Sequence, residues 1–207
     1  MAIRALDELN EIQIDVLREI GNIGSGNAAT ALSAMLMHPI NIAVPKIRIL
    51  DYNDVVEALG GPETMIVGLM LMMEDDVQGM LMFLLEQEFA DVTLSALMGE
   101  GYGSVAEMDE MCQSAIQEIG NIMAGSYVNA ISEMADLQIN ISVPSVCVDM
   151  AGAILSVPAI HYANIGDKVI FIEDEFNRNG QESSSHVLMI PDVDSLKKIM
   201  TNLGIEV

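Results

Sequence analysis

The chain has 207 residues, a formal net charge of −23 and only eight Lys and Arg residues. So few cations argue against a nucleic-acid interface or docking on anionic lipid, because both depend on contacts from Lys and Arg. The longest uninterrupted apolar run, residues 65–73, is too short to cross a bilayer, and the N-terminus does not read as an export signal. We therefore expect a cytoplasmic protein.

The first half of the sequence predicts a long helix, strands, a hairpin and a short helix. The predicted helix over residues 6–37 ends at His38, because the residue before a proline disfavours helical dihedrals, and Gly24-Ser25-Gly26 could bend or break it. The elements that follow are one or two strands over 40–50, a mixed segment over 51–62 with a turn at 60–62, strands over 65–73 and 77–85, and a helix over 88–98. Gly99 ends this helix, and residues 99–103 are the predicted hinge between the halves.

The second half predicts the same plan. Its elements are a helix over 105–135 capped by Ser104, strands over 138–148, 153–157, 168–172 and 185–190, and a helix from Asp192 or Asp194 to Asn202. The polar segment 173–184 reads as an exposed loop. Antiparallel hairpins that alternate with helices, without a βαβ rhythm, predict an α+β fold.

Two stretches repeat one pattern at a separation of 99 residues. Each reads Asp or Ser, then Glu, then Asn three residues later, and a Pro after a further 22 residues. The matched pairs are Asp15 and Ser114, Glu19 and Glu118, Asn22 and Asn121, Gly26 and Gly125, and Pro45 and Pro144. A period near 100 residues predicts a duplicated chain. We expect one domain over residues 1–207, with halves over 6–99 and 104–207 related by a pseudo-two-fold axis and sharing one sheet and core.

On a helix, the Asp or Ser, the Glu, the Asn and the Gly of each copy fall on one narrow stripe. A single Glu-x-x-Asn of this kind is usually only a solvated helix face. The duplication favours a functional site, because a solvated face has no reason to keep the same residue types at one spacing twice. Gly26 and Gly125 carry no side chain, so another surface could approach the helix closely there.

The chemistry available to such a site is limited to a carboxylate and a carboxamide. The sequence contains no Walker loop, dinucleotide fingerprint or zinc-ligand spacing. A carboxamide can both donate to and accept from one water, and could hold it in line with a phosphorus atom. The residues therefore favour assistance of a phosphoryl transfer whose metal and leaving group belong to a partner.

The doubled pattern resembles the CheC family of chemotaxis phosphatases, over nearly the whole chain. The resemblance implies that Asn22 and Asn121 orient an attacking water, and that Glu19 and Glu118 pair with a lysine of a phosphorylated CheY-like response regulator. It implies supporting roles for the other matched residues: Asp15, Ser114, Gly26, Gly125, Pro45 and Pro144. No cofactor of its own is expected, and Mg²⁺ would be carried by the response regulator.

The resemblance leaves alternatives open. CheC-like proteins also bind the receptor deamidase CheD, so a non-enzymatic adaptor that regulates CheD or sequesters phosphorylated CheY is the second hypothesis. CheX-type relatives carry one copy and dimerise, whereas FliY-type relatives add a flagellar-switch domain. Two copies in about 200 residues resemble the CheC type more. Since duplication supplies the symmetry of a dimer, we expect a monomer.

Overall fold

The computed structural model describes residues 6–99, 105, 108–163, 167–178 and 181–206. The first half contains a 3-10 turn at Leu6–Glu8, α1 (Glu11–Leu36), β1 (Asn41–Ile42), β2 (Lys46–Asp51), α2 (Tyr52–Ala58), β3 (Met65–Asp75), β4 (Gly79–Glu86) and α3 (Gln87–Met98). The second contains α4 (Glu110–Ala135), β5 (Ile139–Ile141), β6 (Ser145–Met150), α5 (Ala151–His161), β7 (Lys168–Arg178), β8 (Gln181–Pro191) and α6 (Val193–Asn202). The same order occurs twice, which confirms the α+β fold and the internal duplication.

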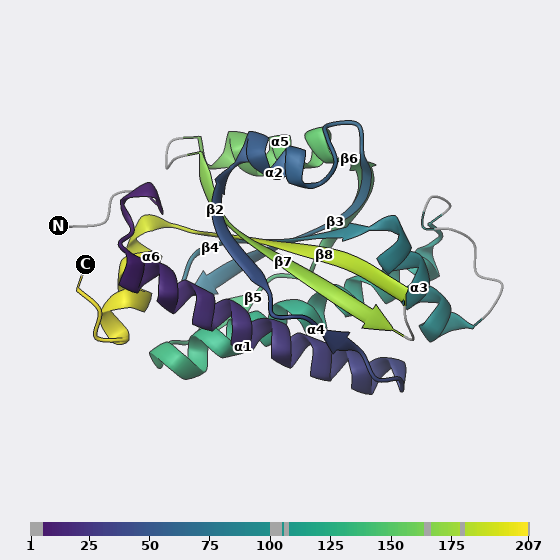
Figure 1. The fold of residues 1–207 in the computed structure, drawn as a ribbon, viewed down its shortest axis with the longest axis horizontal. Helices are drawn as coiled ribbons and strands as arrows, with labels where there is room; N and C mark the ends of the chain where they lie inside the picture. The colour runs from purple at the N-terminus through teal and green to yellow at the C-terminus, as the bar shows by residue number, and fades with distance from the viewer. Residues whose placement is uncertain (1–5, 100–104, 106–107, 164–166, 179–180, 207) are drawn as a thin grey trace.

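The molecule has three layers (Figure 1). The long helices α1 and α4 lie side by side, antiparallel, on one face of a curled antiparallel sheet, and the shorter α2 and α5 lie on the other face. Helices α3 and α6 lie near opposite ends of the sheet, and α6 is close to the start of α1. The two helices that carry the repeated pattern therefore share one side of the molecule.

The sheet interleaves the two halves. Its order is β1-β7-β8-β4-β3-β5, with β2 also beside β7 and β6 beside β3, so each half adds strands to the hairpin of the other. One row of cross-strand partners runs through six residues: Ile47, Ile172, Val187, Phe83, Leu69 and Val146. The two ends of this row are equivalent residues, 99 apart. The pseudo-two-fold axis therefore passes between its middle pair, one residue from β8 and one from β4.

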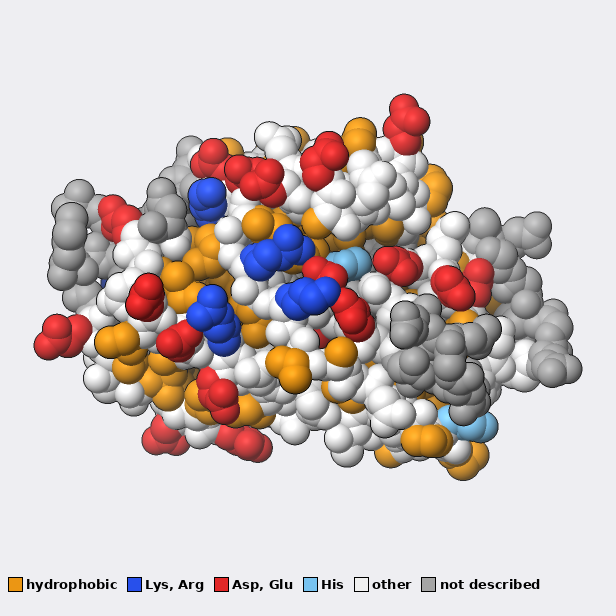
Figure 2. Space-filling model, viewed as in Figure 1, with side chains coloured by type: hydrophobic (Ala, Val, Ile, Leu, Met, Phe, Trp, Pro, Cys, Tyr) orange, Lys and Arg blue, Asp and Glu red, His pale blue; other side chains and the backbone are white. Residues whose placement is uncertain are grey.

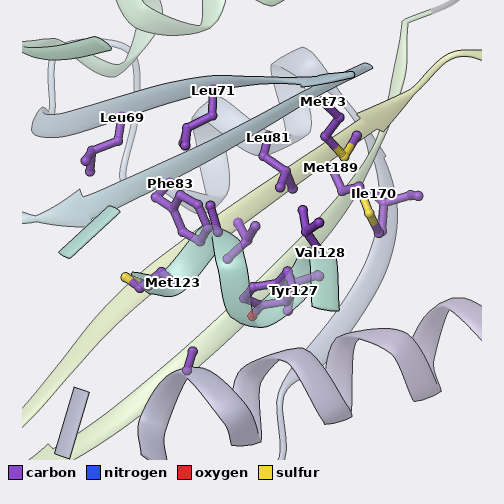
Figure 3. Packing of buried hydrophobic residues seen from close by; sticks show 14 of the residues in the cluster. Leu69, Leu71, Met73, Leu81, Phe83, Met123, Tyr127, Val128, Ile170 and Met189 are labelled. Carbon is purple, nitrogen blue, oxygen red and sulfur yellow. The ribbon is translucent and has the colours of Figure 1, made fainter. Parts of the chain in front are cut away.

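The core lies on both faces of the sheet. The larger cluster fills the space between the sheet and α1 and α4, where Phe83 and Tyr127 contact each other with ring centroids 6.0 Å apart (Figure 3). A smaller cluster lies beneath α2 and α5 and includes Val55 and Ile154. Because apolar contacts hold α1 and α4 from below, the opposite side of each helix is left to solvent.

The long helices begin later than the sequence predicts, and each has a side-chain cap. Asn10 and Gln13 form a capping box on α1, in which the Asn10 side chain accepts from the Gln13 backbone N–H at 3.0 Å. Asp109 caps α4 and accepts from the N–H of Cys112 at 2.8 Å. Residues 24–26 do not break the helix, since α1 continues through them. The cap expected at Ser104 and most of the hinge at 99–103 lie outside the described residues.

Two further predictions are wrong, and each has a physical reason. Residues 153–157 are helix α5, whose buried residues Ala151, Ile154, Leu155 and Pro158 have the spacing of a helix face; α2 is the equivalent helix hidden in the mixed segment 51–62. The expected loop at 173–184 consists mostly of the extended ends of β7 and β8. The polar sequence of this segment predicts a loop. The segment pairs as a strand because Lys46 and Arg48 on β2 neutralise Glu173 and Glu175 on β7.

The hairpin of β3 and β4, the strands β1 and β2 and the helix α6 confirm the sequence-based expectations. Asp192 rather than Asp194 caps α6, and accepts from the Ser195 N–H at 2.6 Å. Gly99 follows α3 with φ of 89°, a conformation that glycine adopts readily. Among the described helices, none combines the length and the apolar character that a membrane span needs.

Candidate functional site

The repeated polar residues form an outward-facing stripe on each long helix. Asp15, Glu19, Asn22 and Gly26 are all exposed on α1; Ser114, Glu118 and Asn121 are exposed on α4, and Gly125 is half-buried. Within the described part of the chain, no residue makes a hydrogen bond or ion pair to the side chain of either Glu or either Asn of the pattern. These four side chains are therefore available to another molecule.

The helical turn that carries each Asn packs closely against the sheet, on the side of the helix opposite the stripe. A Cβ on Gly21 would lie 2.5 Å from Cδ1 of Ile47 on β2, and one on Gly120 would overlap Cδ2 of Leu69 on β3. Only a glycine lets the helix backbone come this close. The next residue, Asn22 or Asn121, then has a fixed height above the sheet and faces solvent.

The repeated prolines lie beside these turns. Pro144 is buried and its Cγ lies 3.7 Å from the position of a Gly120 Cβ, while its carbonyl accepts a hydrogen bond from Gln117 Nε2 at 3.0 Å. Pro45 is half-buried at the start of β2. In the first half Arg18 replaces Gln117 and bonds instead to Asp15 at 2.7 Å. Pro144 therefore packs against the second site from the sheet side, away from the solvent-facing stripe.

The stripe glycines leave open space above the helix. A Cβ on Gly26 or on Gly125 would meet no atom within 4 Å. Glycine interrupts a helix at a cost of about 1 kcal/mol relative to alanine, and packing inside this chain does not account for either one. Their position one turn from each Asn leaves a flat surface that a partner can approach closely.

Exposed apolar residues flank both stripes, and sequence reasoning missed them. Ile12 and Met111 are each 62% exposed, and Val44 and Val143 are 83% and 78% exposed. Each pair is related by the 99-residue repeat. An apolar residue that repeats at an equivalent exposed position is the signal that could have found them. Such residues are typical of a surface that another protein covers.

A shallow depression of about 380 Å³ lies beside the first stripe. Its lining combines the start of α1 with the end of α4 and the segment after α6: Ile12, Asp15, Val16, Glu19, Met134, Leu203 and Ile205. Most of these side chains are apolar, so the two carboxylates lie at the edge of an apolar floor.

The two halves differ in charge on the strands that follow the repeated prolines. Figure 2 shows Lys and Arg side chains near the middle of one face, with acidic side chains beside them. On β2, Lys46 bonds Glu175 at 2.5 Å and Glu173 at 3.2 Å, and Arg48 bonds Glu173 at 3.1 Å. The equivalent positions on β6 are Ser145 and Cys147. The two cationic positions of β2 are therefore neutral in β6, and the side chains of Lys46 and Arg48 lie on the face of the sheet away from α1, since Ile47 between them contacts α1.

Metal ligands do not gather around either stripe. In the ranges that the structure describes, His, Cys, Asp and Glu residues form no group of three or more that could hold a metal ion. What each site offers to a reaction is therefore one exposed carboxylate, one exposed carboxamide and a flat approach.

Comparison with known proteins gives the family. The CheC-like family model matches residues 12–49 and 111–148, the two segments that contain the repeated pattern. "CheY-P phosphatase CheC" of Bacillus subtilis (strain 168) is 34% identical over 200 residues, which are 95% of this chain and 96% of that protein. The chain belongs to the CheC-like family. The resemblance inferred from the doubled pattern is thus confirmed.

A second relative and a solved structure agree with this assignment. "Flagellar motor switch phosphatase FliY" of B. subtilis is 30% identical over 142 residues, which are 68% of this chain and 37% of that protein. The crystal structure of Thermotoga maritima FliY has a TM-score of 0.74 at 27% identity and covers 95% of this chain and 98% of that one. The names of the two curated relatives confirm the expected enzyme class, a phosphatase.

The same architecture occurs in more distant proteins. The middle domain of Helicobacter pylori FliM has a TM-score of 0.70 at 12% identity and covers 94% of this chain. At that identity the likeness concerns the fold alone, and function has to be argued from the two stripes.

Proposed function

We propose that this protein hydrolyses the aspartyl-phosphate of a CheY-like response regulator, with one site on α1 and one on α4. The observation that carries the proposal is the pair of solvent-facing stripes, each with an unengaged Glu and Asn beside an open glycine. The name of the B. subtilis relative, a CheY-P phosphatase, supports the substrate.

The chemistry requires little of the phosphatase itself. An acyl phosphate is already activated, and phosphoryl transfer depends mainly on positioning and on balancing charge. Asn22 or Asn121 accepts from and donates to one water and aims it at phosphorus, while the partner carries Mg²⁺ and the leaving carboxylate. The carboxamide thus does what a water-positioning Gln does in GTPases.

Glu19 and Glu118 fix the register of docking. Each lies one turn from its Asn on the same stripe, where its carboxylate can pair with a lysine of the response regulator. Such a pair orients an approaching partner before the apolar contacts form. Ile12 and Val44, or Met111 and Val143, provide those apolar contacts around each site.

Loss of receiver-bound phosphate tests the proposal. With enzyme well below the concentration of the phosphorylated receiver, wild type should turn over many receivers, and Asn22→Ala with Asn121→Ala should reduce the rate by about 100-fold or more. Asn27→Ala and Asn129→Ala are matched controls, because both remove an exposed carboxamide of the same helices.

Two results would contradict the proposal. A double variant as active as wild type would rule out the two Asn residues as water-positioning groups. Phosphate loss that depends on stoichiometric protein would indicate sequestration of the receiver, the adaptor role, in place of catalysis.

A further inference from the structure

A buried polar cluster lies directly beneath the first stripe. It joins Ser25 of α1, Tyr127 of α4 and Asp174 of β7, and Ser25 lies between the site residues Asn22 and Gly26 in sequence. Ser25 Oγ is 2.7 Å from Tyr127 Oη and 2.7 Å from Asp174 Oδ1, and Tyr127 Oη is 2.6 Å from Asp174 Oδ2. The side chain of Tyr127 lies among apolar residues of the core (Figure 3), and all three residues are buried.

The second half has no such cluster. The repeat places Ala124 at the position of Ser25 and Ala28 at the position of Tyr127. The sheet register places Leu71 at the position of Asp174, because Met70 pairs with Ser145 as Glu173 pairs with Lys46. These three counterparts are buried and apolar.

The glycine at position 24 belongs to the same asymmetry. A Cβ on Gly24 would lie 2.5 Å from the Tyr127 ring, so only glycine lets the ring lie against α1. Its counterpart in the second half is Met123. Since the apolar counterparts build the same architecture beneath α4, the fold does not require the polar cluster beneath α1.

The geometry also fixes the number of protons. Three oxygen–oxygen contacts of 2.6–2.7 Å close a ring, and each contact needs one hydrogen. The two hydroxyls supply two, so the third must come from the Asp174 carboxyl. With that proton, each group donates once and accepts once, and no buried charge remains.

The surroundings of Asp174 favour the neutral form. Ser25 and Tyr127 face it from α1 and α4, and Ser185 is its partner on β8. The charged neighbours Glu173, Glu175, Lys46 and Arg48, together with His186, bond or stack on the other face of the sheet, since successive strand residues alternate. Burial raises the pKa of Asp174, and the hydrogen bonds from Tyr127 and Ser25 offset only part of that rise.

We propose that a protonated Asp174 and the hydroxyls of Ser25 and Tyr127 are positioning groups for the first site alone. The closed ring ties the turn of α1 that presents Asn22 and Gly26 to both α4 and β7. The water-positioning carboxamide of the first site is therefore held by directional bonds, whereas that of the second site is held by apolar packing. This inference rests on the proposed function for what the site does, and on the ring alone for its protonation.

The test uses two backgrounds, each with one working site. Asn121→Ala leaves the first site, and Asn22→Ala leaves the second. Ser25→Ala, which places the counterpart residue in the ring and opens it, should lower kcat about 5- to 10-fold in the first background and change it less than twofold in the second. Tyr127→Phe keeps the aromatic side chain, removes one O–H from the hydrogen-bonded ring and should also lower kcat in the first background.

Asp174→Asn is the conservative variant that separates a neutral ring from a charged one. Its N–H can donate to Ser25 and its carbonyl can accept from Tyr127, so it should keep kcat within twofold of each background. Infrared difference spectra of wild type against Asp174→Asn should show the C=O stretch of a protonated carboxyl, a readout that does not depend on phosphatase activity.

Three results would overturn the inference. The first is an equal loss of kcat in both backgrounds for Ser25→Ala and Tyr127→Phe. The second is no loss of kcat in either background. The third is a missing carboxyl band together with an Asp174→Asn variant whose kcat is as low as that of Ser25→Ala. If the protein shows no phosphatase activity at all, the proposed function fails, and the infrared band still decides whether Asp174 is protonated.

Discussion

The stripe on α1 and the stripe on α4 present the same residue types to solvent, but different contacts hold them from below and beside. Under α1 lies the Ser25 ring, whereas the equivalent positions under α4 are apolar. What repeats is the outward Glu, Asn and Gly together with the inward glycine that presses each helix on the sheet. The comparison therefore separates the features that both halves keep from those that differ between them.

The largest effect is expected from reversing the docking charge. In the Asn121→Ala background, Glu19→Lys should lower kcat/KM about 100-fold, since like charges brought together at an interface cost several kcal/mol. Glu118→Lys should do the same in the Asn22→Ala background. Titrating phosphate release against receiver concentration measures both.

Glu57→Lys is the control, because it makes the same change in charge on α2, across the sheet from both stripes. An equal loss in that variant would show that overall charge, rather than either stripe, sets the rate.

A side chain added to the open surface should weaken docking while it stabilises the helix. Gly26→Leu should raise the free energy of unfolding by about 0.5–1 kcal/mol, because leucine is the better helix former and its Cβ meets no atom within 4 Å. It should also lower kcat/KM of the first site about tenfold, which corresponds to about 1.4 kcal/mol. Urea denaturation and phosphate release measure the two effects, and a stabilised variant with full activity would show that no partner approaches Gly26.

A smaller effect is expected at the exposed apolar pair. Ile12→Asp in the first background and Met111→Asp in the second should each raise KM about fivefold, or about 1 kcal/mol, through the loss of apolar contact with the receiver. Ile160→Asp on α5, where the side chain is 77% exposed, is the control. KM values that rise only for the control would place the docking surface on the other face of the sheet.

The subtlest difference concerns pH. Because burial raises the pKa of Asp174 in the folded protein, its favourable contribution to folding is complete below the ordinary carboxyl pKa of about 4 and is lost as the pH rises through the folded-state pKa. The stability of wild type relative to Asp174→Asn should therefore decline as the pH rises. Urea denaturation across a pH series measures the trend, and a relative stability that increases with pH would indicate an ionised Asp174.

Much of the fold could be predicted because the signals were local. Hairpins that alternate with helices indicated the α+β plan, and turn residues such as Gly99 marked where elements end. The errors at residues 153–157 and 173–184 arose where tertiary contacts decide. The sequence of α5 resembles a strand, and only the structure shows that its buried residues have the spacing of a helix face. The end of β7 resembles a loop because its sequence is polar. In the folded protein β2 neutralises its carboxylates and Asp174 bonds to side chains of two helices.

The candidate site divides in the same way. The stripes could be located from spacing alone, because helical geometry is local and both copies keep it. The exposure of the valines before Pro45 and Pro144 and the contacts of the ring at Ser25 depend on which segments the sheet brings together, so spacing along one helix does not show them. A close reading of the repeat for mismatches, such as Gly24 against Met123, would have pointed to the ring.

The most direct test of the account compares four proteins in one assay of phosphate release: wild type, Asn22→Ala, Asn121→Ala and the double variant. If each stripe is a separate water-positioning site, the rates of the two single variants should add up to the wild-type rate, with the double variant about 100-fold below it. Single variants that are both as inactive as the double variant would contradict two separate sites, and a fully active double variant would contradict the role of the carboxamides altogether.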